Sequence, residues 1–378
     1  MAETDRPTDH YNIDLNRLHW DVAFGRAGGK IIWQPCIGAW YSDKMFAGQS
    51  LPAPYTGMSK PELYRALGCS ARVYEYSSAY TCREDPAVRL SRKHLNATDY
   101  ELCWETPIGS QRAVYRVHKE SPWHEPVKWP IADERDMQIA AWRMERNAWH
   151  WDQATFEEVA AQWSGLGAPT MLLTLRTTIQ RLYVEDMGVG PAIYALQDYP
   201  ATCERYFEAL TMSQERLIDV INASPIDIIN FGDNLASSTS PALFKKYILP
   251  VYQKNCASLH AAGKFISSHW DGACKPLLPY AKETGLDGIE AITPLPQGDV
   301  TLEETKQALG DMFLLDGIPA VFFDRVYNEQ TLIDCAKKCI DLFAPRLILG
   351  ASDEVAAHGD IERVRLVGRI VDDYNASL

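Results

Sequence analysis

Several features that would assign this chain of 378 residues to a protein class are missing from it. No run of eighteen apolar residues occurs, so we expect no membrane span. No cluster of Lys and Arg stands out and the formal net charge is -13, so we do not expect nucleic-acid binding. No GxGxxG follows an early strand, and no GxxxxGK precedes Ser or Thr, so neither a dinucleotide site nor a P-loop has support.

Cysteine is present, but its pattern marks neither a disulfide framework nor a thiol cluster. The nine cysteines are scattered, their number is odd, and no CxxC occurs. In a chain this long, that pattern favours reduced thiols in a cytoplasmic protein. The polar, acidic start MAETDRPTDHYN does not resemble a signal peptide, which leads to the same expectation of a cytoplasmic location.

Apolar runs alternate with helical patterns along most of the chain. This alternation predicts one (β/α)8 TIM barrel domain over residues 1–378, with a doubly wound sheet as the alternative. Residues 87–118 break the pattern with extended segments separated by turns. They predict an antiparallel hairpin insertion after the second strand, spanning about 87–130 and ending in a Pro-punctuated loop, 122–130. The eight barrel strands are represented by Ile31, Val73, Met171, Ile228, Phe265, Gly288, Phe313 and Leu347.

Polar side chains follow the strands in the segment from Phe265 to Pro294. His269 and Asp271 come just past one strand, and Glu290 ends the next. Strand carboxyl ends share one rim in a parallel barrel, so these groups are expected to meet and to bind a metal, handle protons or hold a substrate. Each acid alone is equally well explained as a helix cap. The same rim is expected to collect Asp233, Asn234, Asp316 and Asp353.

Aromatic residues are numerous, with 11 Trp and 18 Tyr. Trp33 lies in the first predicted strand, Trp40 and Tyr41 follow it, and Trp270 is next to His269. A structural role is the default for each of them. Their positions near strand ends also make them candidates for the walls of a pocket that binds a flat ligand.

The run HWDGACKPLLPYAKETGLDGIEAITP resembles the uroporphyrinogen decarboxylase superfamily, especially its corrinoid-linked methyltransferase branch. There a strand ends in His-x-Cys-Gly, and an xTGxD element precedes the next strand. INFGDNLASSTSPALFKKYILPVYQK resembles the FGDD segment and the helix after it, LLDGIP the seventh-strand motif, and LILGASDEV the glycine-rich eighth-strand loop. The resemblance covers most of residues 30–375 and implies a (β/α)8 barrel with its site at the carboxyl rim.

Two departures from the family pattern limit what the resemblance implies. The decarboxylases carry RxxxR after the first strand, where this chain has WQPCIGAWYSDK without Arg, so we do not expect a porphyrinogen substrate. By resemblance to the family's zinc sites, His269 and Glu290 match metal ligands. Asp271 and Asp353 stand at or near the positions of two Cys ligands. The resemblance thus implies either zinc held by hard ligands or a metal-free acid cluster, and it argues against a thiol acceptor.

The resemblance therefore implies a methyltransferase that moves a methyl group from an O-methyl or N-methyl compound to the cobalt of a separate corrinoid protein. No corrinoid-binding DxHxxG segment occurs in this chain, so a partner would carry the cofactor. A homodimer is also implied. The aromatic residues named above favour a methoxylated aromatic donor, with Asn234 orienting it. The expected catalytic groups are His269, Asp271, Asp233 and Asp316.

Two alternatives remain open from the sequence. One is a decarboxylase or lyase of a small acid in the same superfamily, in which Asp316 or Asp233 would assist protonation at carbon. The other is a non-catalytic barrel that binds a methylated or aromatic ligand, or one whose site has degenerated.

Overall fold

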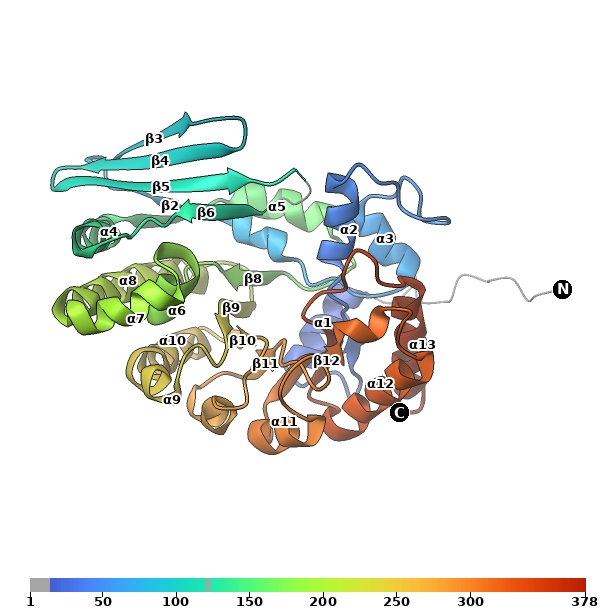
Figure 1. Cartoon of the computed structure of the whole chain (residues 1–378). Coiled ribbons are helices and arrows are strands. Elements are labelled where there is room, and N and C mark those ends of the chain that lie inside the picture. The colour runs from blue at the N-terminus through green and yellow to red at the C-terminus, as the bar shows by residue number, and fades with distance from the viewer. Residues whose placement is uncertain (1–13, 120–122) are drawn as a thin grey trace.

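A curled parallel sheet of seven strands forms the centre of the molecule in the computed structural model, which describes residues 14–119 and 123–378 (Figure 1). The neighbouring strands follow the order β1-β13-β12-β11-β10-β9-β8, and every pair is parallel. This arrangement fits the predicted TIM-like barrel. The strands are β1 Ile32–Trp33, β8 Thr170–Leu173, β9 Ile228–Leu235, β10 Phe265–Trp270, β11 Gly288–Glu290, β12 Phe313–Pro319 and β13 Leu347–Ser352.

Helices cover the outer face of this sheet (Figure 1). One helix, α1 (Leu15–Ala23), instead packs Val22 and Ala23 against the inner residues Ile228 and Phe265 at the amino ends of the strands. No described helix has both the length and the apolar character needed to cross a bilayer. The other α-helices are α2 Gly38–Phe46, α3 Lys60–Leu67, α4 Glu134–Arg146, α5 Gln153–Gln162, α6 Thr178–Arg181, α7 Val189–Asp198, α8 Pro200–Asn222, α9 Pro241–Leu243, α10 Leu249–Ala261, α11 Leu302–Leu309, α12 Glu329–Phe343 and α13 Glu362–Ala376.

The strand predicted around Val73 does not form, which corrects the expectation of eight ladder-forming strands. Residues Tyr74–Ala79 are a 3-10 helix instead. The chain nevertheless lies between β1 and β8, because the Ser70 amide donates to a carbonyl of β1 at 3.0 Å. On the other side, the hydroxyls of Ser77 and Tyr80 donate to a β8 carbonyl at 2.9 and 2.7 Å. Side chains thus supply hydrogen bonds that a regular strand would make with its backbone.

Gly167 shows how closely this irregular segment approaches the chain before β8. A Cβ atom at this position would lie 2.2 Å from the backbone oxygen of Ala71. We expect Gly167→Ala to lower the free energy of unfolding by about 2–3 kcal/mol, because backbone must move to relieve the overlap. Urea unfolding followed by circular dichroism measures the change. The control is Gly190→Ala on α7, where a Cβ atom meets nothing within 4 Å. Equal stability of the two variants would contradict the close approach.

The predicted antiparallel insertion is present as a separate four-stranded sheet, ordered β3-β4-β5-β6. Its strands are β3 Arg89–His94, β4 Asp99–Thr106, β5 Gly109–Val117 and β6 His124–Lys128. The prediction of a loop over 122–130 is wrong for His124–Lys128, because these residues form a strand that pairs with β5. Pro122 lies outside the described residues. A further antiparallel pair, β2 (Tyr80–Arg83) with β7 (Ala148–Trp151), follows the barrel's irregular second segment.

Candidate active site

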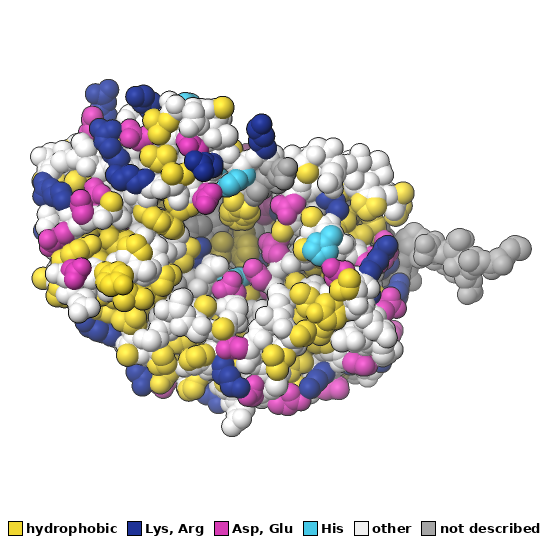
Figure 2. All heavy atoms as spheres, in the orientation of Figure 1, with side chains coloured by type: hydrophobic (Ala, Val, Ile, Leu, Met, Phe, Trp, Pro, Cys, Tyr) yellow, Lys and Arg dark blue, Asp and Glu magenta, His cyan; other side chains and the backbone are white. Residues whose placement is uncertain are grey.

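The register between β10 and β11 brings together the two residues that the sequence placed at neighbouring strand ends. His269 pairs with Glu290 across the ladder, and alternation along β10 turns Ser267 and His269 to the inside of the sheet. The distance from His269 Nδ1 to Glu290 Oε2 is 3.3 Å. A hollow opens on this face of the molecule, with a histidine and several acidic side chains along it (Figure 2).

His269, Asp271 and Asp353 form one cluster, as the rim prediction required. His269 Nε2 lies 3.9 Å from an Asp271 oxygen and 3.7 Å from an Asp353 oxygen. The three residues each offer one ligand atom, and these atoms lie within 4.8 Å of one another. Tetrahedral coordination at about 2.1 Å places donor atoms about 3.4 Å apart. Small movements would therefore let this group hold a metal ion, and its donors are one nitrogen and carboxylate oxygens, without sulfur.

Glu290 occupies a different place from the one expected of a metal ligand. It is 2% exposed, and both of its oxygens already accept hydrogen bonds. Oε1 accepts from Arg72 and from the Tyr74 hydroxyl, and Oε2 accepts from the Asn230 amide. The remaining contact of Oε2 is with His269 Nδ1. Glu290 thus orients the imidazole so that Nε2 faces the two aspartates, and its own role as a ligand stays a prediction.

The charges of this cluster favour the protonated form of His269. Burial lowers the pKa of His269, but its contacts with Asp271 and Glu290, together with the charges of Glu290 and Asp353, raise that pKa well above its ordinary value. Burial also raises the pKa of Glu290, but Arg72 and His269 outweigh burial and leave that pKa lowered. Asp353 has a raised pKa because it is buried, although His269 opposes the shift. With no metal ion bound, the cluster therefore favours an imidazolium among carboxylates.

Arg72 is the main site residue that sequence reasoning missed. It lies in the irregular segment that replaces the second strand, and its guanidinium is buried between Glu290 and Asp316. Nη2 donates to Asp316 Oδ1 at 2.8 Å, and Nε donates to Gln34 Oε1 at 3.0 Å. An arginine inside the otherwise apolar run ARVY was the available signal. A buried cation requires buried acceptors, and two strand-end carboxylates were already in view.

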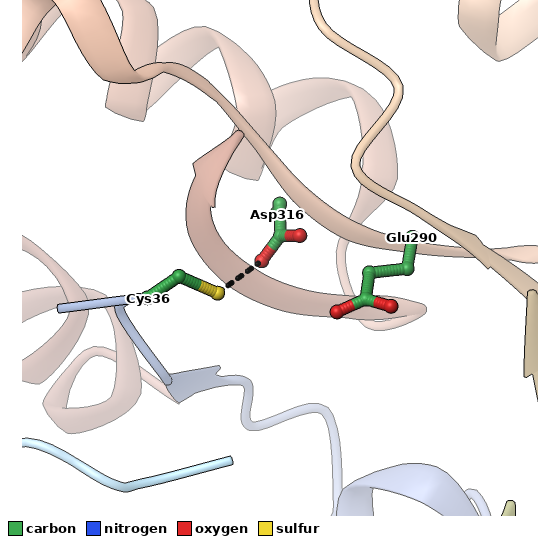
Figure 3. Close-up of side chains that lie close together, drawn as sticks. All are labelled: Cys36, Glu290 and Asp316. Carbon is green, nitrogen blue, oxygen red and sulfur yellow. Dashed lines mark hydrogen bonds between the residues drawn. The ribbon is translucent and has the colours of Figure 1, made fainter. Parts of the chain in front are cut away.

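Asp316 lies deeper than the His269 cluster, in contact with Cys36. Figure 3 shows the side chains of Cys36, Asp316 and Glu290 gathered together, with the Cys36 thiol 3.8 Å from Asp316 Oδ1. Burial raises the pKa of Asp316 to about 7, against the lowering effect of Arg72. Burial also raises the pKa of the Cys36 thiol. These three residues do not fit a metal site, because the Arg72 guanidinium binds both carboxylates and also lies 3.7 Å from the sulfur.

Asp233 and Asn234 do not join the His269 cluster. Asp233 is 1% exposed and accepts from the Thr177 amide and from the Tyr252 hydroxyl of α10, each at 2.6 Å. Burial raises its pKa. Asn234 Oδ1 accepts from Arg176 at 2.6 Å. The structure thus places Asp233 in the contact between β9 and its outer helix, where both of its oxygens are engaged, rather than beside His269.

The aromatic residues predicted to line a substrate pocket are placed mostly elsewhere. Trp33 and Trp40 are buried, and their indole nitrogens donate to carbonyls in α13 and in the loop before it, each at 2.9 Å. Trp270 is fully buried and its ring centroid lies 5.7 Å from that of Phe244, on the outer side of β10. Of the four, Tyr41 alone is half-buried, with its hydroxyl 3.4 Å from a backbone carbonyl. The structure does not bring the three tryptophans to the candidate site.

Comparison with known proteins identifies the family. Residues 188–374 match the family model for uroporphyrinogen decarboxylase (URO-D). This match assigns residues 188–374, close to half of the chain, to the uroporphyrinogen decarboxylase superfamily. The matched part runs from α7 to α13 and contains β9 to β13, so it carries His269, Asp271, Glu290, Asp316 and Asp353. The resemblance that the motifs suggested is therefore confirmed.

Two of the solved structures that resemble this chain are described here by name. A methyltransferase from Methanosarcina mazei has a TM-score of 0.57 at 10% sequence identity, and the match covers 96% of this chain and 99% of that one. This likeness shows a shared fold along nearly the whole chain. A putative vitamin-B12 independent methionine synthase from Listeria monocytogenes has a TM-score of 0.39 at 14% identity, covering 57% of this chain and 67% of that one, which is too low to argue from. No curated protein matches this chain.

Proposed function

We propose that this protein transfers a methyl group from a methylated small molecule, such as a methoxylated aromatic compound, to the cobalt of a separate corrinoid protein. The fold shared with a methyltransferase supports this proposal. The observation that carries it is the His269 cluster, in which Glu290 orients the ring and Nε2 faces Asp271 and Asp353. A site without sulfur ligands suits activation of a leaving oxygen better than activation of a thiol acceptor.

The chemical difficulty in such a transfer is the leaving group. The methyl carbon–oxygen bond breaks while the same carbon bonds to Co(I), which gives up two electrons and becomes Co(III). The oxygen would leave as an alkoxide or phenoxide, which is unfavourable unless its charge is neutralised. In our proposal His269 donates the Nε2 proton to that oxygen, so an alcohol or phenol departs. Asp271 and Asp353 keep the imidazolium oriented, and Glu290 stabilises its charge from the other side.

A metal ion is compatible with the same residues. His269 Nε2, Asp271 and Asp353 would hold it, and it would supply a Lewis acid at the leaving oxygen when bound. Glu290 would then orient the ligating imidazole through Nδ1, as carboxylates commonly do for metal-bound histidines. The tetrahedral spacing discussed above is the basis for this fit. Our proposal assigns His269 to the leaving oxygen in either case, through a proton or through a bound ion.

A direct assay tests the transfer. Protein purified without chelator is analysed for metal and then incubated with free cob(I)alamin and a panel of methoxyphenols and N-methylated amines. We expect methylcobalamin to form in equal amount with the demethylated product for at least one compound, followed by absorbance and chromatography. Failure of every compound with folded protein would contradict methyl transfer. If the parent protein contains a metal and His269→Ala loses both the metal and the activity, the result favours the Lewis acid. If the parent contains no metal and His269→Ala keeps its activity, both roles of His269 are refuted.

Decarboxylation of a small acid is the less favoured alternative, for an electrostatic reason. Such a substrate needs a cation free to bind its carboxylate. Arg72 lies beside the cluster, but it is already hydrogen bonded to Gln34, Glu290 and Asp316. A carboxylate placed next to Asp271 and Asp353 would also be repelled. Measuring carbon dioxide release from small carboxylic acids in the same preparation distinguishes the two reactions.

A further inference from the structure

The helix α7 is built the opposite way from an ordinary surface helix. It fully buries only Ala192 and Ala195, while three of its larger apolar side chains are exposed. Val189 is 39% exposed, Ile193 48% and Tyr194 69%. An amphipathic helix normally turns its large apolar residues toward the core and its polar residues outward. The outer face of α7 thus presents apolar surface to solvent without adding to the core of this chain.

The exposed apolar residues of this chain are concentrated at α7. Residues 184–194 hold four of the fourteen large hydrophobic side chains that are exposed in the described chain. The fourth, Val184, lies in the π-helical turn Leu182–Asp186, which contacts α7. Figure 2 shows hydrophobic side chains gathered where Figure 1 places α7, on the same face as the hollow. Single exposed apolar residues are ordinary, whereas a group of them marks a contact surface. We define the α7 patch as Val184, Val189, Ile193 and Tyr194.

The α7 patch is held in a fixed position by the ends of the helix. A Cβ atom at Gly188, just before the helix, would lie 3.3 Å from the Trp129 ring, so the two residues are in close contact. Pro191 stands in the first turn, where a helix tolerates its missing N–H group. At the other end, the Tyr199 amide donates to the Ala195 carbonyl at 3.0 Å. A surface ordered in advance loses little conformational entropy when it binds a partner.

The outer face of α7 carries no charge, although the net charge of the chain is -13. Residues 187–197 include no Asp, Glu, Lys or Arg, and Asp198 at the end is the only charged residue of the helix. Two copies of an acidic chain repel each other, and a two-fold contact brings each side chain near its own counterpart. A contact between copies therefore requires an uncharged, apolar surface such as this one.

A membrane surface fits the α7 patch poorly. Helices that lie on a membrane carry Lys and Arg on their polar face, which attract anionic lipids. α7 has neither residue, and the negative charge of the chain would be repelled by such lipids. The patch therefore favours a protein surface that is itself apolar and uncharged.

We propose that two copies of this chain associate through their α7 patches in a two-fold arrangement, with Ile193 near the symmetry axis. At 3.6 residues per turn, Ile193 lies between Val189 and Tyr194 around the helix, so it is central to the exposed face. Burial of these side chains against their counterparts removes apolar surface from water, which drives the association. This pairing assigns a surface to the homodimer that the sequence led us to expect, and it does not depend on methyl transfer.

Sedimentation velocity of the full chain, over a hundredfold range of protein concentration, tests the pairing. We expect the parent to be a dimer at the upper concentrations. Ile193→Glu should raise the dissociation constant by about a hundredfold or more, because two carboxylates would then face each other in an apolar contact. The control is Val326→Glu, which adds the same charge at an exposed valine between β12 and α12 and should leave the dimer intact. A parent that is monomeric throughout, or a dimer that Ile193→Glu leaves intact, would overturn the proposal.

A mixture of opposite charges tests the two-fold symmetry. Ile193→Glu and Ile193→Lys are each expected to be monomeric, whereas an equimolar mixture of them should form a dimer, because opposite charges then meet at the axis. If the mixture stays monomeric, α7 does not face its own counterpart, and the proposal is overturned. Circular dichroism checks that each variant is folded. If either variant is not folded, Tyr194→Glu and Tyr194→Lys replace the pair and carry the same expectations, because Tyr194 is the most exposed residue of the patch.

Discussion

Replacing His269 by Gln is expected to lower the rate of methyl transfer by about 10²–10⁴-fold while the protein stays folded. Glutamine keeps a polar side chain of similar reach, so Asp271 and Asp353 retain a hydrogen-bonding neighbour. It cannot carry the proton that the leaving oxygen needs, and it is a poor ligand for a transition metal. The rate is measured as methylcobalamin formed from free cob(I)alamin and the best methoxylated donor.

The pH dependence of the parent protein distinguishes proton donation from mere positioning. The pKa of His269 is raised above its ordinary value, so the imidazolium persists well past pH 6.5. Activity that needs the donated proton is therefore present at and below neutral pH and falls as pH rises through the folded-state pKa. Glu290→Gln removes one source of the shift, so this fall should move to lower pH. The raised pKa of His269 also affects stability. The protonated imidazole stabilises the fold fully at pH values below the pKa of His269 in the unfolded chain, and this stabilisation is lost as pH rises through its pKa in the folded protein.

His260 supplies the control for these measurements. It also lies close to a carboxylate, with Nε2 3.0 Å from Asp287 Oδ2, but it is exposed near the amino ends of the strands. His260→Gln should leave both the rate and its pH profile unchanged. Equal activity of His269→Gln and the parent, or a fall in activity with rising pH that does not move to lower pH in Glu290→Gln, would refute His269 as the proton donor.

The positions of His269, Asp271, Glu290 and Asp353 could be predicted from sequence because they follow from a backbone rule. Parallel strands begin at one edge and end at the other, so residues at strand ends gather without any knowledge of side-chain packing. The register of β10 with β11 then sets His269 beside Glu290. This backbone rule does not say how many hydrogen bonds each carboxylate accepts from its neighbours. For that reason it did not separate the well-satisfied Glu290 from the two aspartates that face Nε2.

The rule fails where side chains replace backbone geometry. The segment around Val73 has the composition of a strand, yet Ser77 and Tyr80 bond to β8 through their hydroxyls, so no ladder forms. Composition alone does not reveal such a substitution. Trp33 and Trp270 illustrate a different limit. They lie on strands beside inward-facing polar residues, and the period of two turns them outward to the helices, where they pack as core.

Replacing Arg72 by Met is expected to lower the free energy of unfolding at pH 7 by about 3–5 kcal/mol, because it leaves Glu290 and Asp316 buried without their shared cation. Both side chains are nearly inaccessible to solvent, and Arg72 is equally buried, so water does not replace the lost contacts. Unfolding in urea, followed by circular dichroism, measures the loss. Arg325 provides the control, because its side chain is exposed where it pairs with Asp360, and Arg325→Met should change stability little.

The pH dependence of the stability that Arg72→Met loses identifies the cause of this loss. Without the guanidinium, burial raises the pKa values of Glu290 and Asp316 above those of the unfolded chain, so the folded variant binds more protons than the unfolded one. Stability is then greatest below the unfolded values, which are near 4 for such groups, and is lost as pH rises through the raised folded values. The difference between variant and parent should therefore shrink from pH 7 to pH 5. Adding Glu290→Gln and Asp316→Asn to Arg72→Met should recover part of the stability at pH 7. If the stability lost is the same at both pH values and in the triple variant, the loss comes instead from the packing of the arginine side chain.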